Sequence, residues 1–231
     1  MRSCRPRCGY GCLLRSTVLA AVAAFAALAG LVASGALTRL DQWAVDHAMP
    51  FAGGSSRPPS FLESVVPLLH AQFHPPGAGI AQIVTLPGQV VISFLLVVVA
   101  AWRLRKATWI AAWVAAVAVE LAFRHLLTRP ALYRNGVHLV AFDTSWPSGH
   151  ALRSAIVAAA LAAAWPRFHI PLGVWLATVA ALLELAGFHT PTDIVGGLLL
   201  ATGTSAGAVA LERSGLLRRR TAGAGRALGE S

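Results

Sequence analysis

Long apolar runs without a charged side chain restrict this chain more than any other feature. Residues 17–37 form an uncharged apolar run of twenty-one residues, which is long enough to cross about 30 Å of hydrocarbon as a helix. The run is too long for the apolar region of a signal peptide, so we expect an uncleaved first membrane helix, although Ala33–Ala36 faintly resembles a cleavage site. Apolar residues make up 56% of the chain and charged residues 12%, which favours a membrane protein over a soluble domain.

Six such runs predict an all-α fold, a bundle of six transmembrane helices. Pro87–Gly88 interrupts the second run early, and a proline without an N–H breaks a helix there. In the loop between the first two runs, Leu40–His47 is expected to lie along the membrane interface as a short amphipathic helix, and Phe61–Leu69 to form a second short helix. The predicted spans are residues 17–37, 79–102, 107–127, 147–165, 170–188 and 192–211.

The charges predict three segments and an orientation. Residues 1–16 are a basic N-terminus, 17–211 a six-span membrane domain, and 212–231 a basic tail that we expect to be disordered. Thirteen basic residues lie on the side of the two termini and five on the opposite side, so the positive-inside rule predicts that both termini are cytoplasmic. The net charge of +10 does not indicate nucleic acid, because the basic residues form no stripe interleaved with aromatics. Three cysteines precede the first run with no metal-binding pattern; they are Cys4, Cys8 and Cys12.

The string Ser145-Trp-Pro-Ser-Gly-His150 opens the fourth run with residues that suit phosphate binding. A helix that begins with Pro-Ser-Gly leaves backbone N–H groups free, and a helix N-terminus attracts anions. The free amides and the Ser148 hydroxyl can surround phosphate oxygens, and His150 can donate a proton to a leaving group near neutral pH. The alternative is an ordinary capped helix start with a histidine at the interface.

His189 and Asp193 place an imidazole and a carboxylate one helical turn apart where the sixth run begins. A carboxylate that binds one ring nitrogen fixes the tautomer and leaves the other nitrogen free to attack phosphorus. The alternative is a helix-capping aspartate beside a loop histidine. In the predicted topology His150 and His189 both lie on the outer face of the membrane, at the same depth.

Three arginines are candidates for the positive charge that a phosphate site needs. Arg124 and Arg129 end the third run, where guanidinium groups bind phosphate oxygens in pairs or, alternatively, only snorkel to the interface. Glu120 lies four residues before Arg124 and could pair with it. Arg153 follows His150 inside an apolar run, where an arginine is costly unless it has a function or a partner.

These motifs resemble those of the type 2 phosphatidic acid phosphatase family of membrane lipid phosphatases, which is related to the vanadium haloperoxidases. The family pattern is Lys-x6-Arg-Pro, then Pro-Ser-Gly-His, then Ser-Arg-x5-His-x3-Asp, and the resemblance by motif covers residues 107–205. It implies a six-helix bundle with its site at the extracytoplasmic face and no metal or other cofactor. It also implies roles for five residues: His189 as nucleophile, Asp193 as its orienting group, His150 as acid, and Ser148 and Gly149 as phosphate-binding groups.

The chain departs from the family pattern in its arginines. If Arg124 stands at the Lys place, the family Arg place falls on Ala131, and Arg129 comes two residues early. Arg134 is a possible substitute. In the third motif, Leu182–Leu183 stand where the family has Ser-Arg.

Arg153 can supply the missing charge, and Glu184 can hold it in place. A purely structural pair between Arg153 and Glu184 is equally compatible with the sequence.

The resemblance implies a hydrolase that removes a phosphate or pyrophosphate group from a lipid in the bilayer, through a phosphohistidine. The departures leave open a degenerate relative that binds lipid phosphate, or scaffolds a membrane complex, without turnover. A small transporter has less support, because the polar residues gather at one face and do not continue through the bilayer. The sequence does not specify the lipid or the oligomeric state.

Overall fold

The protein is described by a computed structural model that covers residues 7–50, 52 and 78–227. Within these residues the fold is all-α, with eight α-helices and one pair of two-residue strands. The short helix expected at Phe61–Leu69 lies outside the described residues. The β pair joins Tyr133–Arg134 (β1) to Val137–His138 (β2) in antiparallel register. The helices are α1 (Arg7–Ala33), α2 (Thr38–His47), α4 (Ala78–Thr85), α5 (Val90–Leu104), α6 (Thr108–Leu126), α7 (Gly149–Ala164), α8 (His169–Leu185) and α9 (Pro191–Ala227).

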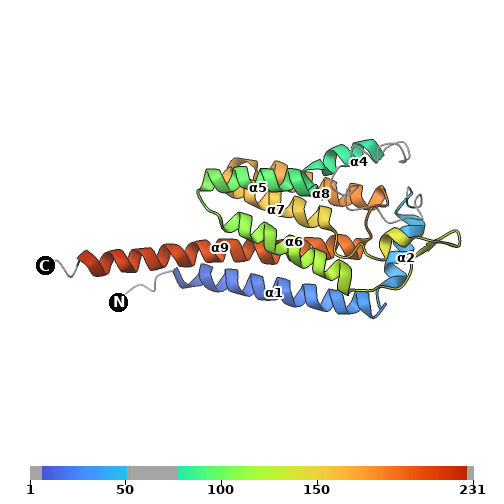
Figure 1. Ribbon diagram of the computed structural model, residues 1–231, viewed down its shortest axis with the longest axis horizontal. Helices are drawn as coiled ribbons and strands as arrows, with labels where there is room; N and C mark the ends of the chain where they lie inside the picture. The colour runs from blue at the N-terminus through green and yellow to red at the C-terminus, as the bar shows by residue number, and fades with distance from the viewer. Residues whose placement is uncertain (1–6, 51, 53–77, 228–231) are drawn as a thin grey trace.

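The long helices lie side by side in one elongated bundle (Figure 1). The two termini lie at one end of the bundle, and α2 with the β pair covers the other end. Helix α7 occupies the centre, where it packs against α5, α8 and α9. Its residues Leu152, Ile156 and Val157 are fully buried, and alanines along the same helix allow the neighbouring backbones to approach closely.

Among the described residues, four helices are long and apolar enough to cross a membrane, or five if the bent pair of α4 and α5 counts as one span. This number is typical of a multi-pass membrane protein. The four segments are Gly11–Ala33, Thr108–Leu126, Pro166–Leu185 and Pro191–Ser214. Helix α7 has 16 residues and is shorter than a usual span.

Most predicted elements are present, with shifted ends. The expected helix at Leu40–His47 is confirmed as α2. The first helix ends at Ala33, four residues before the predicted end, because a turn with a left-handed glycine at Gly35 leads directly into α2. The expectation of a disordered tail over 212–231 is wrong for residues 212–227, since α9 continues as a helix to Ala227.

The interruption at Pro87–Gly88 divides the second predicted span into α4 and α5, which meet at an angle of 49°. A 3₁₀ turn over Leu86–Gly88 connects them. A Cβ at Gly88 would come within 2.5 Å of Ser154 Oγ and 2.9 Å of the His150 carbonyl oxygen, so only glycine fits against α7 here. The break therefore brings the start of α5 against the first turns of α7.

Candidate functional site

The two predicted histidines meet at the end of the bundle away from the termini. His150 lies in the first turn of α7, and His189 lies in the connection between α8 and α9. Their ring centroids are 5.9 Å apart, with the ring planes tilted by 52°. His189 is buried and His150 is half-buried. The two imidazoles thus lie next to each other, one from the first turn of α7 and the other from the α8–α9 connection.

The start of α7 has the geometry of a capped helix N-terminus. The buried Ser148 hydroxyl accepts a hydrogen bond from the Ala151 N–H (3.2 Å) and the Ser148 carbonyl accepts one from Leu152 (3.0 Å). Ser148 N–H donates to the Asp193 carbonyl (2.9 Å), which ties α7 to the first turn of α9. The next two N–H groups, of Gly149 and His150, have no acceptor within the helix. They are the amides that can bind an anion.

Asp193 lies beside His189 but forms its short hydrogen bonds with other groups. His189 Nδ1 is 3.7 Å from Asp193 Oδ2, longer than a hydrogen bond. Asp193 accepts from the Ser145 hydroxyl (2.6 Å) and from the Thr190 N–H (3.0 Å). Burial lowers the pKa of His189 below its ordinary value, and the neighbouring Asp193 opposes this shift. The ring therefore stays neutral at pH 7, with Nδ1 turned toward the carboxylate.

Arg129 connects two carboxylates through its two terminal nitrogens. One terminal nitrogen lies 2.8 Å from Asp193 and the other 2.6 Å from Asp41 of α2. Asp41 also accepts from the Thr192 hydroxyl (2.7 Å). Both terminal nitrogens of Arg129 therefore contact carboxylates, and its side chain is only 3% exposed. The phosphate-binding role expected for Arg129 stays a prediction.

Asp41 is a member of this network that the sequence analysis missed. It lies on the buried face of α2, and burial raises the pKa of its carboxyl, while Thr192 and Arg129 counteract that shift. The sequence did carry a signal for this role, because Asp41 lies on the apolar, buried face of an amphipathic helix, where an acidic side chain needs a partner.

Arg134, the other arginine considered as a phosphate ligand, holds a loop. Its guanidinium donates to the carbonyl oxygens of Met49 and Ala52, just after α2. It therefore stabilises the polar end of the bundle.

A buried carboxylate holds the remaining two arginines. Glu120 lies 3.1 Å from Arg124 and 2.6 Å from Arg153, so the predicted pairing of Glu120 with Arg124 is confirmed. Arg153 also donates from Nε to the Gly88 carbonyl (2.7 Å). The prediction that Glu184 holds Arg153 is wrong, because Arg153 forms its ion pair with Glu120 of α6.

The Glu120 cluster lies directly beside the start of α7. A Cβ at Gly149 would clash with Glu120 and would come within 2.6 Å of Arg153, so glycine is needed for this close approach. Arg153 is nearly buried, whereas the Arg124 side chain is 31% exposed. Two guanidinium groups and one carboxylate leave a net positive charge next to the free amides.

Gln89 is a second residue that the sequence analysis did not identify. Its side-chain nitrogen lies 2.8 Å from His150 Nε2, and its side-chain oxygen is buried without a hydrogen-bond partner in the described residues. Gln89 is the N-cap residue of α5, so the break in the α4–α5 pair positions it. No sequence pattern identifies such a contact, since the two residues lie 61 positions apart.

Within the described part of the chain, no group of three or more His, Cys, Asp or Glu side chains is placed to hold a metal ion. The chain was also compared with protein-family models, with curated proteins and with solved structures, and it matches none of them.

Proposed function

We propose that the protein is a membrane phosphatase that hydrolyses a lipid phosphate monoester or diphosphate through a phosphohistidine. The observation that supports this most is the pair of imidazoles, 5.9 Å apart, at the N-terminus of a buried helix. A phosphoryl group fits between a nucleophile on one side and a proton donor on the other. The resemblance to the type 2 phosphatidic acid phosphatases suggests the same pair of roles.

In the first step His189 attacks phosphorus. Its Nδ1 is turned to Asp193, so the attacking atom is Nε2, whose lone pair forms the N–P bond as the P–O bond to the lipid breaks. His150 gives a proton to the departing alkoxide or phosphate. Asp193 stabilises the positive imidazole that results.

In the second step water hydrolyses the phosphohistidine. His150, now neutral, accepts a proton from the water as its oxygen attacks phosphorus, and the N–P bond electrons return to His189. Inorganic phosphate leaves, and both histidines regain their starting protonation states. The reaction needs no oxidant, reductant or further reactant.

The positive groups beside α7 stabilise the charge of the phosphoryl oxygens. We assign this role to the Gly149 and His150 amides, to Arg124 and to Arg153. In this proposal Arg153 takes the place of the arginine that the family pattern has where this chain has Leu183. Such preorganised donors lower the barrier because they are already oriented when charge develops. Ser148 caps α7 and keeps the amides directed at the site.

The proposed membrane arrangement has six spans, with both termini in the cytoplasm and the site at the outer face. The bent α4–α5 pair and the short α7 supply the two spans beyond the four long helices. Because α5, α8 and α9 enclose α7, its 16 residues need not match the full hydrocarbon thickness. The lipid chain would stay in the bilayer while its phosphate enters the polar end of the bundle.

The test is phosphate release by the purified protein from a panel of lipid phosphates and diphosphates. We expect release that vanadate inhibits, and a trapped phosphoenzyme at His189. His189→Ala should abolish both, whereas His138→Ala, at the same end of the bundle and paired with Asp143, should keep them. Tight binding of lipid phosphate without release by the unaltered protein would favour a catalytically degenerate binding protein instead.

A further inference from the structure

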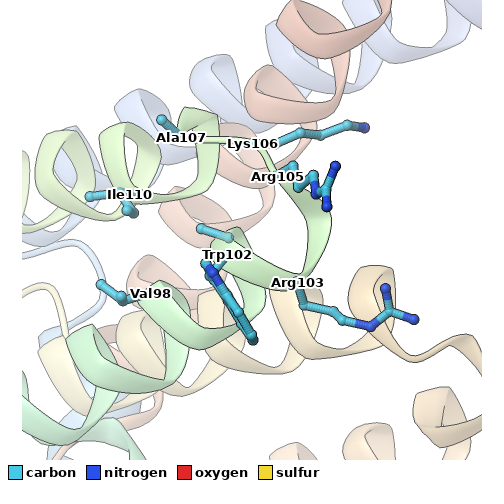
Figure 2. Close-up of a pocket in the computed structure, with 8 residues that line it drawn as sticks. Val98, Trp102, Arg103, Arg105, Lys106, Ala107 and Ile110 are labelled. Atoms are coloured by element: carbon cyan, nitrogen blue, oxygen red, sulfur yellow. The ribbon is translucent and has the colours of Figure 1, made fainter.

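A pocket of about 570 Å³ lies at the junction of α5 and α6 (Figure 2). This junction is at the end of the bundle where the two termini lie, away from α2 and the histidines (Figure 1). The charge distribution predicts that this end is cytoplasmic. The pocket is therefore separate from the proposed phosphatase site.

One side of the pocket is apolar. Val98 and Ile110 line it from the two helices (Figure 2). Trp102, four residues after Val98, is 80% exposed. A tryptophan this exposed at the end of an apolar helix is typical of the membrane interface, where its ring meets both acyl chains and headgroups.

The other side of the pocket is basic. Arg103 and Arg105 are exposed, and neither has an ion-pair partner in the described part of the chain. Figure 2 shows both guanidinium groups extending away from the apolar side. Lys106 is already paired with Glu212 of α9 (2.7 Å), and Glu212 also accepts from the Thr108 hydroxyl (2.8 Å). Two uncompensated positive charges thus remain for a ligand.

Arg105 occupies a backbone position that normally favours glycine. It caps the C-terminus of α5 in the left-handed region, with φ 54° and ψ 44°. The other described residues with positive φ are glycines and Asn135, which tolerate this conformation. A non-glycine residue is strained in this region, so the presence of an arginine here indicates a functional role for its side chain.

We propose that this pocket binds an anionic glycerophospholipid of the adjacent leaflet. The lipid phosphate lies between Arg103 and Arg105, and one acyl chain follows the apolar side along Val98 and Ile110. A lipid fits both halves of the pocket, because acyl chains cover apolar side chains within the bilayer and phosphates gather at basic residues near its surface. The proposal does not depend on phosphatase activity.

The test is photo-crosslinking of the full-length protein in phosphatidylcholine nanodiscs that contain a phosphatidylglycerol with a diazirine in its acyl chain. We expect labelling of the segment 98–110 that saturates, that unlabelled phosphatidylglycerol displaces, and that weakens as salt is raised. The double variant R103Q/R105Q should weaken binding roughly 30-fold, since each basic residue near an anionic lipid surface contributes about 1 kcal/mol.

Two further variants separate lipid binding from folding and from catalysis. Arg105→Gly suits the left-handed backbone, so it should fold normally and still bind the lipid roughly fivefold more weakly. Arg167→Gln, at the same end of the bundle and stacked on Phe168, should bind normally, as should His189→Ala. Equal labelling by a phosphatidylcholine probe, unchanged affinity in the double variant, or an acidic protein held there in place of lipid would overturn the proposal.

Discussion

The carboxylate of Glu120 lies 2.6 Å from a guanidinium nitrogen of Arg153, and its other oxygen lies 3.1 Å from Arg124. This contact joins α6 to α7 immediately beneath the free amides at Gly149. One buried negative charge thus holds two positive groups in fixed orientation beside the space between the histidines.

Removing the Glu120 charge should destabilise the protein. We expect Glu120→Gln to lower the free energy of unfolding by about 3–5 kcal/mol, because Arg153 is left buried without its counter-charge. The double variant E120Q/R153Q should lose about 1–3 kcal/mol less than the sum of the single losses. Denaturation in detergent measures all three. Glu184→Gln is the control, within about 0.5 kcal/mol of the parent; an equally large loss there would contradict the observed pairing.

Arg124 and Arg153 should each contribute to the affinity for phosphate. Replacing either by glutamine removes charge-assisted hydrogen bonds, so the inhibition constant for vanadate should rise about tenfold to a hundredfold. Arg153→Lys should recover only part of this loss, since lysine lacks the planar pair of donors. Arg39 is exposed on α2 at the same end of the bundle, so vanadate should inhibit Arg39→Gln with the same inhibition constant as the parent. If Arg153→Gln binds vanadate as tightly as the parent, Arg153 is only structural.

The order of the helices could be predicted because it depends on the length of apolar runs, which the sequence displays directly. The ends could not: α9 continues past the predicted boundary to Ala227, since a basic, glycine-containing segment carries no apolar periodicity that marks a helix. The proximity of His150, His189 and Asp193, in contrast, could be predicted, because α7 and α9 both begin at the same end of the bundle.

The partners of these residues depend on helix packing, which no local pattern encodes. Both Glu120 and Glu184 are acidic residues in apolar runs, and only the packing of α6 against α7 decides that Glu120 meets Arg153. Asp41 contacts Thr192 across 151 positions of sequence. Gln89 reaches His150 only because α4 and α5 are bent at Gly88.

Arg129 should affect turnover through Asp193 and not through the substrate. We expect Arg129→Lys to lower kcat at least tenfold with little change in KM, because one ammonium group cannot bridge Asp41 and Asp193 as the guanidinium does. Steady-state kinetics on a lipid phosphate measures this. Asp46→Asn, on the exposed side of α2, should behave as the parent. A raised KM with unchanged kcat would instead show that Arg129 binds the phosphate directly.

Gln89 should control the protonation cycle of His150. Its amide nitrogen donates to the neutral ring, and after rotation its oxygen can accept from the protonated ring. Gln89→Leu removes both bonds and should lower kcat about tenfold to a hundredfold. Gln89→Glu should move the alkaline limb of the pH–rate profile to higher pH, since a carboxylate favours the protonated imidazole. Gln82→Leu on α4 is the matched control; an unchanged pH profile in Gln89→Glu would rule out this role.

The burial of His189 predicts how phosphoenzyme formation depends on pH. Because burial lowers the pKa of His189 below its ordinary value of 6.5, the nucleophile should remain neutral through pH 6.5 and lose activity only at lower pH. Rapid-quench measurement of the phosphoenzyme across the acidic and neutral range locates this limb. In Asp193→Asn the limb should move further down, since the carboxylate raises the pKa of His189. A limb at or above pH 6.5 in the parent would mean that the ring is hydrated and exposed during the attack, contrary to its position between α8 and α9.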